Sequence, residues 1–231
     1  MKEIPILYSS EMIRAKLAGR KTVTRRLVKI KYLANSEIGS IHPDGAGTGW
    51  VAWSPRPVSA EETKRCYPGA EGFKCPYGQP GDVHWIKENH FQYGFWIEAE
   101  GEYTQSGLPK LRFIPVTNDV KFVENPPEEI KRLNRKDLST PGWYSRSSLF
   151  LPKYASRIWE RVINVKPERL HDITEEYAKR EGATPEHHDS YIGAFMKIWR
   201  EINGPESWEA NPWVWRIQTE TLSTTGRPEN L

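Results

Sequence analysis

Glycine and proline interrupt this chain so often that it leaves room for few long regular segments. The 231 residues contain 17 glycines and 18 prolines. These residues recur throughout 35–80, where neither a helical nor a strand period persists. Turn residues at this density favour short strands joined by loops. With few helical segments beside them, we predict an α+β protein built on a small, partly closed, PUA-like mixed β-barrel with flanking helices and long loop insertions.

Three segments nevertheless have a helical pattern. Residues 9–19 combine a serine cap, an acidic first turn and a terminal glycine, and 189–204 carries an apolar stripe typical of a core-facing helix. A third helix over 172–182 ends at Gly182. It leaves Glu181 in the last turn, where the helix dipole disfavours a carboxylate by about 0.3–1 kcal/mol. An acid in this position suggests a specific role.

The remaining regular segments are predicted strands of one domain. Because 21–28 follows the first helix directly, Lys21 and Thr24 are expected at a helix-to-strand junction, a place that commonly carries function. We expect a single domain over 1–221, with insertions at about 31–80 and 89–150 and a polar tail over 222–231. The strands of the predicted barrel are 21–28, 83–88, 158–165 and 211–222.

Charge and motifs limit the function classes. The formal net charge is +3, which permits a nucleic-acid or nucleotide partner without requiring one. The sequence contains no GxGxxG, P-loop, HExxH or GxSxG element, so we expect no cofactor. It also lacks a signal-type apolar run and a segment of about 18 apolar residues. We therefore expect a soluble, cytoplasmic protein with no membrane partner.

The two cysteines leave a metal site as the less favoured alternative. Cys66 and Cys75 are separated by eight residues, and His42 and His84 are the other potential zinc ligands. This spacing matches no common zinc pattern. We therefore predict two free thiols and no metal.

The stretch LAGRKTVTRR concentrates cations and threonines just after the first predicted helix. One interpretation is a solvated surface, because exposed lysines and strand threonines are common. In the same interpretation, Glu181 pairs with Lys179 or Arg180 at a solvated helix end. The other interpretation is a site for a nucleotide-like substrate.

Several motifs together resemble the ASCH domain of the PUA-like superfamily, in particular its larger phage and prophage members. The resemblance runs in patches from about Ile4 to Thr221, and it implies a cleft lined by a K-T-x-T-x-R element. A small bacterial member of this family is an amidohydrolase that deacetylates N4-acetylcytidine with a lysine, a threonine and a glutamate. Matching the motifs places these on Lys21, Thr24 and Glu181. The motifs are GRKTVTRR, PGDVHWIKE, SRIWERVINV, RLHDITEEYAKREG and NPWVWRI.

The resemblance implies a chemistry for these residues. Thr24 supplies the attacking hydroxyl, Lys21 activates it if burial and nearby cations lower its pKa, and Glu181 passes the proton to the leaving amine. We assign substrate binding to Arg25, Arg26 and Trp85. Of these, Arg26 matches the arginine of the motif. Two alternatives remain: a non-catalytic module that binds RNA, or less favourably DNA, through phosphate contacts, and a ribonuclease.

Aromatic and histidine residues complete the predictions. Trp85, Trp213 and Trp215 lie on predicted strands, where core packing is the default and stacking on a base is the alternative. Trp143 and Tyr144 follow a Pro-Gly turn in the second insertion and are candidates for a lid. We expect His187 and His188 at the surface.

Overall fold

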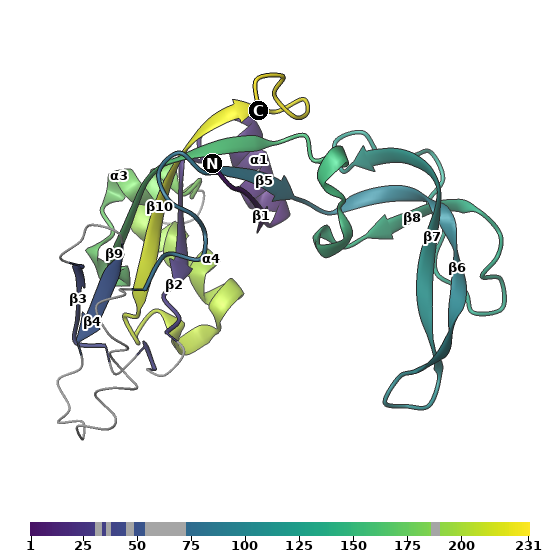
Figure 1. Ribbon diagram of the computed structural model, residues 1–231, viewed down its shortest axis with the longest axis horizontal. Coiled ribbons are helices and arrows are strands. Elements are labelled where there is room, and N and C mark those ends of the chain that lie inside the picture. Colours follow the sequence, from purple (N-terminus) through teal and green to yellow (C-terminus); the bar gives the residue numbers. More distant parts are fainter. Residues whose placement is uncertain (31–33, 36–37, 45–48, 54–72, 186–189) are drawn as a thin grey trace.

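The computed structural model describes residues 1–30, 34–35, 38–44, 49–53, 73–185 and 190–231. Figure 1 shows two parts, a sheet with helices packed against it and a second sheet that projects away from the first. The fold is mixed α+β, mostly strands with few helices, which confirms the predicted class. Cys66, His187 and His188 lie outside the described residues.

The first sheet has five strands in the order β1-β5-β9-β10-β2. The pair β1 and β5 is parallel and the other pairs are antiparallel. The edge strands β1 and β2 do not pair within the described residues, so strand pairing leaves the sheet open. A side-chain hydrogen bond from Arg26 Nη2 to the Leu7 carbonyl, 2.6 Å long, connects the two edges. The strands are β1 (Glu3–Leu7), β2 (Val23–Leu27), β5 (Val83–Lys87), β9 (Trp159–Arg169) and β10 (Trp213–Ser223).

The three predicted helices are present, each with a side-chain cap. They are α1 (Ser10–Leu17), α3 (Glu175–Arg180) and α4 (Tyr191–Asn203), capped by Ser9, Thr174 and Ser190. Short 3-10 turns occur at Ser148–Phe150, Lys153–Ala155, Leu170–Asp172 and Pro205–Ser207. No helix in the described part of the chain has the length and apolar character needed to cross a membrane.

Separate apolar clusters hold these helices to the sheet. Helices α3 and α4 share a cluster that includes Ala178, Phe195, Trp199 and Val214 of β10. Helix α1 packs through Ile13 against a second cluster, which includes residues of β1 and β5 and Ile158, just before β9. A third cluster surrounds Trp215, which is buried in the core as the default interpretation had it. One cluster therefore holds α4 in place and another holds α1.

The two predicted insertions contain strands of their own. Strands β3 (Ser40–Pro43) and β4 (Trp50–Trp53) form a hairpin. Strands β6 (His90–Tyr103), β7 (Pro109–Phe122) and β8 (Gly142–Arg146) form the projecting sheet, in the order β7-β6-β8 (Figure 1).

The lid predicted from Trp143 and Tyr144 is wrong. Both residues belong to β8 of the projecting sheet, where Tyr144 is buried against Trp96 and Phe113. The ring of Trp143 packs edge-on against Tyr93, with 5.6 Å between the ring centroids. The Pro-Gly turn indicates a change of direction but does not reveal the sheet that follows it.

Candidate active site

The junction between α1 and β2 brings two distant segments together. Gly19 adopts a positive φ of 71°, and the N–H groups of Arg20 and Lys21 both donate to the Ala15 carbonyl. The next residue, Thr22, donates its N–H to the carbonyl of Arg180 at 2.9 Å. The start of β2 is therefore bonded to the end of α3, beside Glu181.

Gly182 makes this close approach sterically feasible. Its φ is +92°, which favours glycine, and a Cβ at this position would lie 2.6 Å from the Cβ of Ala15. The same atom would lie 3.5 Å from the Lys21 Cβ. The glycine that ends α3 therefore also lets the helix end contact α1 and Lys21.

Lys21 is buried and all its ammonium protons have acceptors. The side chain is 1% exposed. Its Nζ donates to Glu181 Oε2 at 2.9 Å, to the Glu181 carbonyl at 3.0 Å and to the Val23 carbonyl at 2.8 Å. Burial lowers the pKa of Lys21 and the Arg26 charge adds to the effect, although Glu181 opposes both. The lysine is thus held in place by its hydrogen bonds, while its environment makes loss of a proton easier than in water.

Arg25 binds the other oxygen of the same carboxylate. Its Nη1 donates to Glu181 Oε1 at 3.1 Å, and its Nη2 donates to Glu168 Oε1 at 2.6 Å. Glu168 in turn pairs with Arg216 on the neighbouring strand β10. Arg25 is therefore already occupied by two carboxylates, which makes it a group that orients Glu181 more than a free ligand for substrate. We call Lys21, Arg25, Glu168 and Glu181 the Glu181 cluster.

The other three predicted site residues differ in their positions. Thr24 is buried on β2, and its hydroxyl makes no hydrogen bond within the described residues. Arg26 is partly exposed; its Nη2 is bound to Leu7 and its buried Nε has no partner among the described atoms. Trp85 lies on β5, where the ammonium group of Lys87 is 5.4 Å from its ring centroid.

A cavity of about 190 Å³ lies directly beside the Glu181 cluster. Arg25, Arg26 and Glu181 contribute polar groups to its wall, whereas Lys21, which contacts Glu181, and Thr24 are buried and do not line it. Trp85 does not line it. Its apolar lining comes from α1, β2, Tyr77 and α4, where it includes part of the stripe that the sequence indicates as ordinary core. The residues are Met12, Leu27, Tyr77, Phe195, Ile198, Trp199 and Ile202.

A second buried carboxylate lies close to Lys21 and was not predicted. The ring centroid of Tyr8 is 5.3 Å from Lys21 Nζ, and the Tyr8 hydroxyl donates to Glu160 Oε1 at 3.0 Å. Glu160 also pairs with Lys16 and accepts from Thr219. His84 Nδ1 is 3.0 Å from the same carboxylate. We call Tyr8, Lys16, His84, Glu160 and Thr219 the Glu160 cluster. Their sequence positions carry no common motif that could have revealed it.

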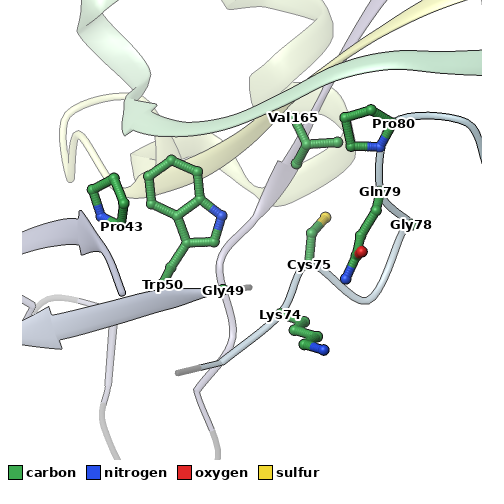
Figure 2. Close-up of a pocket in the computed structure, with 9 residues that line it drawn as sticks. All are labelled: Pro43, Gly49, Trp50, Lys74, Cys75, Gly78, Gln79, Pro80 and Val165. Carbon is green, nitrogen blue, oxygen red and sulfur yellow. The ribbon is translucent and has the colours of Figure 1, made fainter. Parts of the chain in front are cut away.

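A second cavity, of about 320 Å³, lies between the β3–β4 hairpin, the segment 74–80 and Val165 of β9. Figure 2 shows Trp50, Cys75 and Val165 among the residues around it. None of the predicted site residues lines this cavity.

The potential zinc ligands do not assemble in the described part of the chain. His84 is engaged by Glu160 and by the Tyr77 carbonyl, and His42 contacts Ser40. Burial raises the pKa of the Cys75 thiol to about 12. Within the described ranges, no three His, Cys, Asp or Glu residues are grouped so as to hold a metal ion.

The structure thus brings Arg25, Arg26 and Glu181 to one cavity wall with Lys21 in contact with Glu181, whereas neither Thr24 nor Trp85 lines the cavity. Comparison with protein-family models, with curated proteins and with solved structures finds no match to this chain. The function of the cavity is therefore inferred from its own residues.

Proposed function

We propose that this protein is an ASCH-type, PUA-like protein that binds a modified nucleoside or nucleotide in this cavity and hydrolyses an N-acyl amide of the N4-acetylcytidine type. The main support is the direct contact between Lys21 and Glu181, 2.9 Å long between residues 160 positions apart, at the wall of a cavity. In this proposal the five-stranded sheet corresponds to the PUA-like barrel, and the contact between Arg26 and Leu7 links its open edges.

The shape of the cavity suits a single base. Its volume of about 190 Å³ is below the usual range for drug-sized ligands, so a small planar group is the appropriate size. Its lining combines apolar residues, Phe195 and Trp199 among them, with the charged groups of Arg26 and Glu181. A heteroaromatic ring with polar edges matches this mixture of apolar and charged groups.

In the proposed reaction, the Thr24 hydroxyl attacks the acyl carbonyl carbon while its proton passes to a neutral Lys21. The C–N bond then breaks, and the leaving nitrogen receives a proton through Glu181. Water attacks the resulting ester, releases the acid and returns the proton to Thr24. Because Thr24 is buried and does not line the cavity, the structure has to open locally for substrate to reach its hydroxyl.

The decisive experiment is a chromatographic assay of N4-acetylcytidine and related N-acyl nucleosides. Wild-type protein is compared with Lys21→Met, Thr24→Val and a control, Lys197→Met, which alters an exposed lysine of α4 outside the cavity. We expect turnover that falls by about a hundredfold or more in the first two variants, the usual effect of removing a catalytic group. Folded wild-type protein that turns over none of these compounds would refute the hydrolase, and RNA affinity that weakens with salt would then favour the binding module.

A further inference from the structure

Charge is distributed unequally around the cavity. In the described part of the chain, the cations in or directly behind its wall are more numerous than the acids. Two carboxylates, Glu168 and Glu181, form ion pairs with three of these cations, and the charge of Glu160 also acts on Lys21. The cations are Lys21, Arg25, Arg26, Lys29 and, through Glu168, Arg216.

The uncompensated charge lies on Arg26 and Lys29. Lys21, Arg25 and Arg216 each contact one or both of the two carboxylates. Arg26 is bound only to a neutral carbonyl, and Lys29 is exposed; neither makes an ion pair among the described residues. Both line the cavity, three positions apart at the end of β2. The two cations without acidic partners among the described residues therefore both lie at the cavity wall.

An uncharged acyl nucleoside carries no negative group with which Arg26 and Lys29 could pair. The proposed hydrolysis needs Lys21, Thr24 and Glu181, and none of its steps calls for two further cations. An excess of positive charge in a partly enclosed cleft raises the local concentration of anions. A guanidinium and an ammonium group are the side chains that most often bind phosphate.

We infer that the substrate of this cavity carries a phosphoryl group, which Arg26 and Lys29 bind. This inference rests on the proposed function and names its substrate class. Two sources share the chemistry: a free N-acylated cytidine monophosphate, and an N-acylated cytidine within a short RNA. In both cases the base occupies the apolar part of the cavity while the phosphate lies at the cationic rim.

The experiment compares kcat/KM for N4-acetylcytidine, its 5′-monophosphate and a trinucleotide that contains it. We expect wild-type protein to prefer a phosphorylated substrate by about tenfold or more, the usual contribution of a charge-assisted hydrogen bond. The preference should decrease as salt is raised. Lys29→Gln should reduce the ratio of kcat/KM between phosphorylated substrate and nucleoside towards one, whereas the control Lys197→Gln on α4 should keep this ratio. The better of the two phosphorylated substrates identifies the source.

Equal turnover of the nucleoside and both phosphorylated compounds would overturn this inference and leave the hydrolase intact. If no compound is turned over, the hydrolase fails, and calorimetric binding decides the phosphoryl site separately. Cytidine 5′-monophosphate that binds more tightly than cytidine to wild-type protein, but not to Lys29→Gln, would support the site. Equal binding of the two would refute it.

Discussion

The Glu160 cluster and the Glu181 cluster use the same chemistry in different surroundings. Each carboxylate is buried, each pairs with a lysine from the first 21 residues, and each has further partners from distant strands. Glu160 is 0% exposed and lines none of the described cavities. Glu181 is 6% exposed and forms part of the wall of one.

The difference in access separates a structural role from a chemical one. A sealed group of charges acts only on folding, because no ligand reaches it, and removal of one partner leaves the others unpaired. A similar group at a cavity can also exchange protons with a ligand. Tyr8 connects the two clusters, since its ring contacts Lys21 and its hydroxyl binds Glu160. The following predictions test whether this separation holds.

The largest effect is expected from Glu160→Ala. The substitution leaves Lys16 buried without its carboxylate, which typically costs 3–5 kcal/mol for a broken buried pair, so about 4 kcal/mol is expected. Urea unfolding gives the change in free energy. Glu220→Ala, at an exposed position on β10, is the matched control and should change stability by about 0.5 kcal/mol or less. Similar changes in unfolding free energy for both variants would contradict a structural role for Glu160.

Acid should weaken the Glu160 cluster selectively. Burial alone would raise the pKa of Glu160, but the hydrogen bond with His84 and the charge of Lys16 outweigh it and hold the pKa at about 2, against an ordinary 4.5. Because the folded pKa is depressed, its contribution is fully present above pH 4.5 and is lost as pH falls towards 2. The stability lost between these pH values is about 3 kcal/mol of unfolding free energy, at 1.36 kcal/mol per unit of pKa difference.

Unfolding free energies of wild type and Glu160→Gln, measured from pH 6 to pH 2, check this effect. The difference between the two proteins should shrink as pH falls from 4.5. A difference that stays constant over this range would show that Glu160 does not titrate as an ion pair in the folded protein.

Gly182→Ala should have an intermediate effect on the Glu181 cluster. The new methyl group would meet the Cβ of Ala15 in a backbone conformation that disfavours alanine, so a loss of about 1–3 kcal/mol is expected. Gly107→Ala is the control, since Gly107 also has a positive φ but nothing lies near its Cβ position. Thermal unfolding distinguishes the two. An equal loss in both would mean that φ alone matters and that the contact between α1 and α3 does not.

An effect of similar size is expected from Tyr8→Phe, which breaks the link between the clusters but keeps the ring against Lys21. Loss of one hydrogen bond to a buried carboxylate should cost about 1.5–3 kcal/mol at most. Because the ring is retained, the pH profile of turnover should keep its shape. A shifted profile would show that Glu160 influences Lys21 and that the clusters are not separable.

Local signals made much of the fold predictable. The helix over 9–19 is α1 because Ser9 caps it and Gly19 ends it, and Glu181 stood out because its position conflicts with the helix dipole. Thr22, which bonds the end of α3 to β2, carries no comparable signal. Local patterns therefore located the elements but not the bonds between them.

Features that depend on long-range pairing could not be predicted. Glu168 of β9 and Arg25 of β2 meet because both strands pair with β10, one on each side. No spacing in the sequence encodes that strand order. The apolar stripe of α4 predicted a core helix correctly, but the same residues Phe195 and Trp199 also face a cavity. Periodicity reports burial, and it does not distinguish a packed core from the wall of a small pocket.

The most direct test of the central difference is turnover of N4-acetylcytidine by Glu181→Gln, measured beside the control Glu176→Gln, an exposed glutamate of the same helix. If the Glu181 cluster carries the chemistry, folded Glu181→Gln should lose about a hundredfold or more in kcat/KM while Glu176→Gln retains wild-type turnover. Wild-type turnover by folded Glu181→Gln would show that this cluster, like the one around Glu160, serves only the structure.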